Sequence, residues 1–375
     1  MQSEQLQDWL LLYHGAKASG RRLSRLLHSL GDPGRVLDQP VSLLTASGLE
    51  PALAEAISRA REPQSVAHQR MLLDMDWLTQ PGHHILCWPD AFYPPLLREI
   101  ADPPPVLYVA GDPQVLSQPM LAIVGSRNSS RYGRDIAATL SRELCRAGLV
   151  ISSGLASGID TAAHRAAVEN CRPTVAVLGS GLKNVYPLAN RQLASKITGG
   201  EVNGAVVSEF PLNTAPDTFH FPQRNRIISG MSLGVCVVEA SLRSGSLITA
   251  RLALEQNRNV FAVPGSVNMP GSRGCHQLLR DGATLTENAA DVIDALQPLL
   301  QGQIELLEKV KEQTSRARLP SGCRDLFKLI GDDPITTDQL QRLSGLSHAE
   351  LAARLLKLEI SGHIYRSAGK WALNR

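Results

Sequence analysis

In Leu121-Ala122-Ile123-Val124-Gly125-Ser126-Arg127, four aliphatic residues are followed by Gly-Ser-Arg, and sequence typical of a helix extends from Gly133 to Ala147. An apolar run that stops at small residues before a helix predicts a strand-loop-helix unit. N–H groups at the start of such a helix lack partners and, with the helix dipole, favour an anion. We therefore expect Gly125, Ser126 and Arg127 to bind a phosphate, with the Arg127 guanidinium donating two hydrogen bonds to it.

The same pattern returns in Ile151-Ser152-Ser153-Gly154-Leu155-Ala156-Ser157-Gly158-Ile159-Asp160, which leads into helical sequence up to Glu169. Further apolar runs end at small or polar residues, and they cover 174–178, 205–207, 235–238 and 260–263. Strands read as continuous apolar runs when helices cover both faces of a parallel sheet, and such sheets bind ligands at the carboxyl ends of their strands. The predicted fold class is α/β, with an extended Rossmann-like parallel sheet and helices on both of its faces.

A third motif, Phe219-His220-Phe221-Pro222-Gln223-Arg224-Asn225-Arg226, places aromatic and basic residues together before the apolar run at 235–238. In an extended segment, Arg224 and Arg226 lean to the same side and would follow successive phosphates. Phe221 offers a ring on which an unpaired base could stack, but the same ring could belong to the core.

These motifs, together with Arg243-Ser244-Gly245-Ser246 and the following Thr249-Ala250, resemble the DNA-processing protein A family (DprA, also called Smf) from Phe92 to Leu296. The resemblance implies a protein that binds single-stranded DNA, protects it and helps to load the RecA recombinase in natural transformation and homologous recombination. It implies no known catalytic activity and no cofactor. It also implies a homodimer formed through the late part of the central domain, where Leu278 and Leu279 are candidates for the interface or for the core.

The residues that we assign to DNA or phosphate binding come from these motifs and from the loop after residue 178. They are Gly125, Ser126, Arg127, Ser153, Gly154, Gly158, Asp160, His164, Gly179, Gly181, Lys183, Phe221, Arg224, Asn225, Arg226, Ser244, Gly245 and Ser246. The family has an acidic residue or Asn at the position of Lys183, and often a basic residue where this chain has Leu188, so one basic contact is moved or lost.

Two carboxylates and a histidine near these motifs favour structural roles. Asp160 and His164 are four residues apart on one predicted helix, and with Ser153 they could form a hydrolytic trio. We favour instead Asp160 as the residue that positions the helix start and His164 as a hydrogen-bonding partner within the loops. Glu239 is predicted to hold the loop 244–246 through backbone N–H groups.

Composition describes an ordinary globular chain of 375 residues, with 43% hydrophobic and 19% charged residues. The formal net charge is only +3, so DNA affinity has to come from locally placed Arg and Lys side chains. The six cysteines form no C-x-x-C pair, which argues against a zinc site and a disulfide framework. Neither a secretory signal nor a run of 18 apolar residues is found, so we expect a cytoplasmic protein with no membrane partner.

Changes in pattern along the chain predict several domains. Residues 1–62 are expected to form a small helical domain that resembles a sterile-alpha-motif domain, 63–110 a connector that packs on the central domain, and 111–300 the DNA-binding domain. A charged linker covers 301–320. In 321–375, three helices and a hairpin predict a winged helix that reads DNA or binds protein, because Glu350 and Glu359 stand beside Arg354 and Lys357.

Other functions are weighed against this one. The G-x-G-x-x-G fingerprint of a Rossmann dehydrogenase is absent from the loop after residue 124. Nucleotide hydrolases of the lysine-decarboxylase-like group carry P-G-G-x-G-T-x-x-E, whereas this chain has Ser244-Gly245-Ser246-Leu247-Ile248-Thr249 with no carboxylate following. That hydrolase and a winged-helix transcription factor remain the alternatives.

Overall fold

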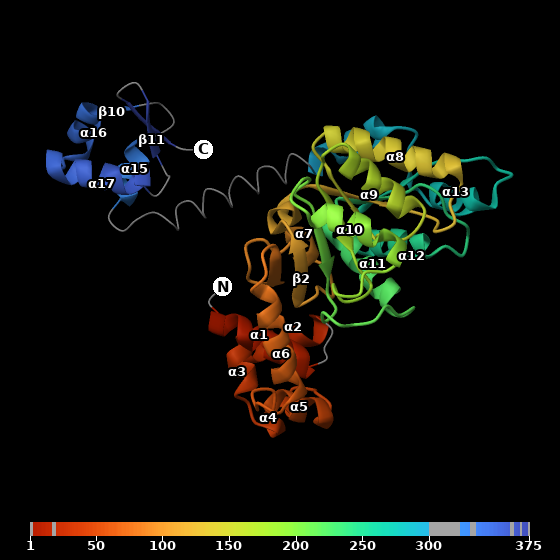
Figure 1. Ribbon diagram of the computed structural model, residues 1–375, viewed down its shortest axis with the longest axis horizontal. Coiled ribbons are helices and arrows are strands. Elements are labelled where there is room, and N and C mark those ends of the chain that lie inside the picture. The colour runs from red at the N-terminus through yellow and green to blue at the C-terminus, as the bar shows by residue number, and fades with distance from the viewer. Residues whose placement is uncertain are drawn as a thin grey trace. The chain divides into compact units, whose positions relative to one another are not determined.

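The computed structural model describes residues 3–16, 20–299, 323–330, 335–360, 364–367 and 370–373. The chain divides into two compact units, Met1–Gln297 and Pro298–Arg375 (Figure 1). The finer boundaries predicted at residues 62, 110, 300 and 320 stay a prediction, and the predicted linker 301–320 lies outside the described residues.

In the described part of the larger unit, nine strands form one sheet in the order β1-β2-β6-β5-β4-β3-β7-β8-β9. The strands are β1 (His83–Cys87), β2 (Val106–Gly111), β3 (Met120–Val124), β4 (Val150–Ser153), β5 (Thr174–Val177), β6 (Ala205–Ser208), β7 (Gly234–Val237), β8 (Asn259–Ala262) and β9 (Thr284–Leu285). Strands β3 to β9 pair in parallel, which confirms the predicted sheet. Strands β1 and β2 add an antiparallel edge, so two segments of the predicted connector 63–110 are part of the sheet itself.

The strand order reverses at β3. From β3 the chain adds β4, β5 and β6 on one side, then returns to place β7, β8 and β9 on the other side. Such a reversal is where open α/β sheets leave a crevice for ligands, outside the carboxyl ends of the strands. The loops after β3 and β7 flank this point.

Helices cover both faces of the sheet, as predicted. The helices α8 (Arg131–Arg146), α9 (Ile159–Glu169) and α10 (Arg191–Thr198) pack side by side, and α11 (His220–Met231) packs with α12 (Gly245–Glu255). Both α9 and α11 contact β3, β4 and β5, and they belong to these two different groups of helices. The residues of β3 to β7 are therefore buried on both faces, and each large aliphatic side chain contributes about 1.5–3 kcal/mol to folding.

Helix α11 corrects the prediction of an extended segment at Phe219–Arg226. Pro222 lies in the first turn of the helix, where a backbone N–H has no intrahelical partner and its loss costs little. Ile227, Ile228 and Met231 are buried at helical spacing, and this packing against the sheet outweighs the weak local propensity of the segment. Arg224 and Arg226 consequently do not lean to the same side, because residues two apart on a helix point in nearly opposite directions.

Short helices complete the larger unit. The N-terminal helices are α1 (Ser3–Ala16), α2 (Gly20–Leu30), α3 (Pro33–Leu37), α4 (Val41–Ala46), α5 (Pro51–Ser58) and α6 (Val66–Leu78). Later helices are α7 (Pro95–Arg98), α13 (Arg273–Arg280) and a helical stretch that begins at residue 289, with 3-10 turns η1 (Pro113–Ser117), η2 (Leu188–Asn190) and η3 (Pro270–Ser272). No helix among the described residues is long and apolar enough to span a membrane.

The N-terminal helices share a core with the edge strands β1 and β2. A buried polar cluster joins them: the Asp74 carboxylate on α6 accepts a hydrogen bond from the Tyr108 hydroxyl on β2 at 2.6 Å and lies 2.7 Å from Nε2 of His14 on α1. Tyr13, beside His14, donates to the Glu209 carbonyl at 2.5 Å. These bonds tie the helices to the sheet.

The smaller unit has the predicted winged-helix layout. Its helices are α15 (Arg324–Ile330), α16 (Thr337–Ser344) and α17 (His348–Ile360), and β10 (Ile335–Thr336), β12 (Lys370–Leu373) and β11 (Ile364–Ser367) form a sheet in that order. Thr336 and Gln339 form a capping box at the start of α16. Gly345 ends that helix in the left-handed region, at φ 66°, before α17 of the predicted winged helix begins.

Candidate nucleic-acid interface

Four loops follow the carboxyl ends of neighbouring parallel strands and lie side by side at that end of the sheet. We call them the loop crest: residues 179–184 after β5, 154–158 after β4, 125–130 after β3 and 239–246 after β7. Neighbouring strands lie about 4.8 Å apart, so residues of adjacent loops are within reach of a single ligand. The loop crest spans the reversal of strand order and contains most of the predicted site residues.

The loop 125–130 is fixed by Glu239. The Ser126 N–H donates to the Glu239 carbonyl at 2.7 Å, and the Glu239 carboxylate accepts from the Ser130 N–H at 3.0 Å and from the Ser130 hydroxyl at 2.6 Å. Two predictions are corrected here: the Ser126 amide is already used within the protein, and Glu239 holds the loop 125–130, not the loop 244–246. The Arg127 side chain remains exposed.

Close backbone approaches explain the glycines that begin these loops. A Cβ on Gly125 would lie 2.6 Å from Cγ1 of Ile159, at the start of α9. Gly158 has φ +84°, and a Cβ there would collide with the carbonyl oxygen of Ser126. A larger residue at either position would separate the loops after β3 and β4, so these glycines shape the loop crest.

Gly154 is held by a buried charge on each side. Its N–H donates to the Asp160 carboxylate at 3.1 Å, and its carbonyl accepts from the Arg224 guanidinium at 2.6 Å. Arg224 also donates to the Val177 carbonyl and, through Nε, to Oδ1 of Asn225 at 3.1 Å. Burial lowers the pKa of Arg224 to about 10 and raises the pKa of Asp160, each opposed by attraction to the other. The pair joins α11 to the ends of β4 and β5.

Arg226 points elsewhere and is also paired. Its guanidinium binds the Glu209 carboxylate, and its Nε lies 3.6 Å from Oδ2 of Asp102. Burial raises the pKa of Glu209, while the charge of Arg226 opposes this shift. Both arginines that were predicted to follow successive phosphates therefore have protein partners, and neither presents a free guanidinium to solvent.

His164 lies in the interior beside the loop 154–158. The Thr174 hydroxyl donates to the Ile151 carbonyl at 2.6 Å, so it receives its other bond, of 2.8 Å, from Nδ1–H of His164. Burial lowers the pKa of His164 to about 3 and keeps the ring neutral. Ser153 donates to the Ile123 carbonyl at 2.6 Å. Ser153 thus gives its hydroxyl proton to the Ile123 carbonyl and not to His164, as a hydrolytic trio would require.

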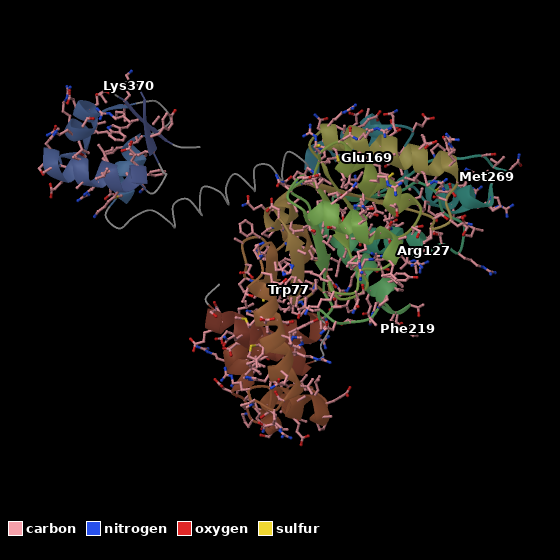
Figure 2. The ribbon with its side chains drawn as sticks, viewed as in Figure 1. Trp77, Arg127, Glu169, Phe219, Met269 and Lys370 are labelled. Atoms are coloured by element: carbon pink, nitrogen blue, oxygen red, sulfur yellow. The ribbon has the colours of Figure 1, made fainter. Side chains whose placement is uncertain are left out.

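Aromatic rings lie beside Arg127. The Phe221 ring, in the first turn of α11, is half-buried above Gly179, where a Cβ would lie 2.8 Å from its Cδ1. The Arg127 guanidinium carbon stands 4.9 Å from the Phe221 ring centre, and the Tyr186 ring centre is 5.9 Å from it. Phe219 is 78% exposed, and Figure 2 shows it at the rim of the larger unit, on the same side as Arg127. Tyr186 was not among the predicted site residues; only its proximity in space to Phe221 reveals it.

The remaining predicted residues lie at the two ends of the loop crest. Gly181 approaches the Pro211 and Leu212 carbonyls, and the Lys183 side chain is exposed. Ser244 caps α12 by accepting from the Ser246 N–H at 3.4 Å, and Ser246 is buried. Nothing lies within 4 Å of a Cβ placed on Gly245, so the start of this 11-residue helix is open to solvent. Arg243, which precedes it, is exposed.

The loop crest thus combines exposed cations with an exposed helix start and aromatic rings. Arg127, Lys183 and Arg243 carry the exposed charges, while the carboxylates of Asp160, Glu209 and Glu239 are turned into the protein. In the described ranges no group of three or more His, Cys, Asp or Glu side chains is placed to hold a metal ion. Such a surface suits a polyanion with stacking groups.

Family comparison agrees with these motifs. A family model described as DNA recombination-mediator protein A matches residues 84–297, more than half of the chain. The chain belongs to the DprA/Smf family. A second model, the DprA winged helix domain, matches residues 311–370.

Members of the DprA/Smf family resemble this chain over most of its length. Protein Smf of Escherichia coli K12 is 36% identical over 95% of this chain and 92% of that protein. DNA processing protein DprA of Streptococcus pneumoniae is 46% identical over 63% of this chain and 83% of that protein. The X-ray structure of DprA from S. pneumoniae covers 76% of this chain and 95% of that chain, with a TM-score of 0.65 and 36% identity. DprA of Helicobacter pylori, whose structure addresses its single-stranded DNA binding mode, has a TM-score of 0.51 and 32% identity over 58% of this chain and 96% of that chain.

Arg224 and Arg127 are expected to differ when each is replaced by alanine. Arg224→Ala leaves Asp160 as an uncompensated buried charge and two carbonyls without a donor, so the free energy of unfolding should fall by about 3–5 kcal/mol. Arg127→Ala removes an exposed side chain and its contact with Phe221, at a cost of about 0.5–1 kcal/mol. Urea denaturation of both variants gives the comparison. Equal stability of the two would show that Arg224 is not a structural residue.

His164 is expected to make stability depend on pH. The pKa of about 3 in the folded protein lies below the ordinary value of 6.5, so the unfolded chain binds the proton more readily between these values. The free energy of unfolding should therefore fall as pH decreases below about 6.5, by up to about 1.4 kcal/mol per pH unit. The raised pKa values of Asp160 and Glu209 have the opposite effect, because these carboxyl groups bind protons more readily in the folded protein. Their contribution is present in both proteins, so it cancels when the stability curve of His164→Gln is subtracted from that of the wild type. Parallel curves for the wild type and His164→Gln would contradict the assignment.

Proposed function

We propose that this protein binds single-stranded DNA along the loop crest, protects it and helps to load the RecA recombinase onto it in natural transformation and homologous recombination. The observation that carries the proposal is the Arg127 guanidinium, exposed on a loop that Glu239 fixes and next to the Phe221 ring. A guanidinium placed in this way can bind a phosphate while neighbouring rings contact bases. The single-stranded DNA binding of the H. pylori relative supports it.

The preference for unpaired DNA follows from the aromatic residues. A base can stack on a protein ring only when it leaves its own stack, and each such contact contributes about 1–3 kcal/mol. Phe219, which is 78% exposed, and Phe221, at the start of α11, both border the loop crest. Duplex DNA would engage the cations alone.

Among the predicted site residues, the exposed cations Arg127 and Lys183 are proposed to contact phosphate directly, with the open helix start at Ser244 and Gly245 as an anion site. Gly125, Gly154, Gly158, Gly179 and Gly181 are proposed to act through the loop shapes that they permit. Arg224, Asn225 and Arg226 are proposed to act indirectly, by holding α11.

Binding without turnover is part of the proposal. A nucleotide hydrolase needs a free carboxylate at the ligand, whereas Asp160 accepts from backbone amides and Glu239 from Ser130. We keep the winged-helix transcription factor as the second candidate because the smaller unit has that fold, with exposed Tyr365 and Lys370 on its hairpin. We also propose a cytoplasmic location, supported by six free cysteines, five of them buried.

Single strands are expected to bind more tightly than a duplex of the same length and sequence, because only unpaired bases reach the rings. Affinity should fall with salt, with a slope of log K against log salt of about −0.7 for each phosphate contact on a single strand. Fluorescence anisotropy with labelled oligonucleotides measures both. Arg127→Ala should weaken binding and reduce the magnitude of the slope by the value of one phosphate contact. Replacement of Arg251, an exposed residue in the middle of α12, by alanine is the matched control. Equal affinity for the two DNA forms would remove the basis of the proposal.

A homodimer through α13 is the assembly that we propose, so that several protomers can cover a longer strand. Leu278 and Leu279 are half-buried against the main core, and Leu285 on the edge strand β9 is 49% exposed. Leu279→Glu is expected to give monomers that bind DNA less tightly, while deletion of the winged helix, a separate compact unit, preserves the dimer. Analytical ultracentrifugation decides: a dimer that persists in Leu279→Glu, or a monomeric truncation, would place the interface elsewhere.

A further inference from the structure

The loop after β6, residues 209–214, contacts the N-terminal helices. The Tyr13 hydroxyl on α1 donates to the Glu209 carbonyl at 2.5 Å, across 196 positions of the sequence. Burial raises the pKa of Tyr13, so its hydroxyl keeps the proton that it donates. Leu212 is buried in the core that the N-terminal helices share with β1 and β2. We call residues 209–214 the bridging loop, because they also contact the loop crest.

The loop 179–184 of the loop crest is bound to the bridging loop. Three of its donors reach backbone carbonyls there: the Lys183 N–H donates to Leu212 at 3.1 Å, the Gly181 N–H to Thr214 at 2.9 Å and the Asn184 side-chain amide to Asn213 at 2.9 Å. A Cβ on Gly181 would lie 2.2 Å from the carbonyl oxygens of Pro211 and Leu212, so the two backbones approach as closely as glycine permits. The position of the bridging loop therefore sets the position of the loop 179–184.

Lys183 has a fixed backbone and an exposed side chain. Leu182, the residue before it, packs against the same core as Leu212. A lysine ammonium group ends a flexible four-carbon stem, so the place that it can reach depends on where its backbone is held. Holding that backbone in the folded protein reduces the conformational entropy that is lost when the ammonium group binds a phosphate.

The bridging loop also contacts α11, but that helix has further anchors. The Phe210 and His220 ring centres are 4.3 Å apart, and the Glu209 carboxylate binds Arg226. Arg224 fixes the same helix to the ends of β4 and β5 without using the bridging loop. Loss of one hydrogen bond at the bridging loop is therefore expected to affect the backbone of Lys183 more than α11.

We propose that the N-terminal helices position Lys183 for its phosphate contact, through the Tyr13 hydroxyl and the bridging loop. This role rests on the proposed function and makes Tyr13 a positioning residue, which acts through Lys183 and need not touch DNA. The N-terminal helices then contribute to DNA affinity because they keep one cation of the loop crest in place.

Tyr13→Phe tests this role, because it removes the hydroxyl and keeps the ring. It is expected to weaken oligothymidylate binding about 2- to 10-fold, the effect of one lost hydrogen bond, and to shift the salt slope toward that of Lys183→Ala. In the Lys183→Ala protein, Tyr13→Phe should change affinity little, because the contact that it positions is gone. Combined with Arg127→Ala it should keep its full effect. Fluorescence anisotropy measures all the variants.

Tyr93→Phe is the matched control, because the Tyr93 hydroxyl also donates to a backbone carbonyl, that of Pro104 at 2.7 Å, outside the bridging loop. It should bind oligothymidylate as the wild type does, and circular dichroism checks that every variant is folded. The positioning role is wrong if Tyr13→Phe binds as tightly as the wild type, or if it weakens binding equally with and without Lys183. Normal binding by Lys183→Ala would also overturn it.

The proposed function has a separate point of failure. If the wild-type protein does not bind oligothymidylate, single-stranded DNA is not its ligand, whatever the variants do. If the wild type binds and only the double-substitution comparison fails, DNA binding stands and the role of Tyr13 alone is rejected.

Discussion

The loop crest depends on the buried contacts around Gly154. Asp160 accepts from its N–H and Arg224 donates to its carbonyl, so a single peptide group is held between opposite charges inside the protein. Either charge alone would be costly to bury, and together they are stable only while the loop after β4 keeps its shape. Because Arg224 comes from α11 and Asp160 from α9, the pair also joins helices on opposite faces of the sheet.

Glu239 plays the corresponding part across the reversal of strand order. Its carboxylate holds Ser130 and its carbonyl holds Ser126, so hydrogen bonds join the loop after β3 to the loop after β7. The conformational entropy of these loops is therefore lost when the protein folds and not when a ligand binds. A flexible polyanion then loses its own freedom on binding, but the protein has little more to lose, which favours affinity.

The sequence predicted the parallel strands and the loops because both depend on local patterns: apolar runs of four or five residues that end at Gly or Ser. It failed at 219–226, where the local preference for an extended chain gave way to packing of Ile227 and Ile228 on the sheet. Burial of the two arginines could not be predicted either. The residues around an arginine are the same whether its guanidinium binds a phosphate or a backbone carbonyl. Only the arrangement of strands that are distant in sequence decides which of these two groups lies next to it. For the same reason Tyr186, 35 residues from Phe221, escaped notice.

The charged side chains of the site fall into two groups: buried ones that hold the loops in place and exposed ones that are available to a ligand. Asp160, Glu209 and Glu239 each accept hydrogen bonds inside the protein, which removes negative charge from the surface that would repel a phosphate. The same pairing occupies the carboxylates that general acid or base catalysis would need. Arg127 is left exposed beside aromatic rings, so a cation is available at the loop crest even though the net charge of the chain is only +3. One arrangement of buried partners thus leaves cations exposed at the carboxyl end of the sheet, which supports the proposed binding of a polyanion there.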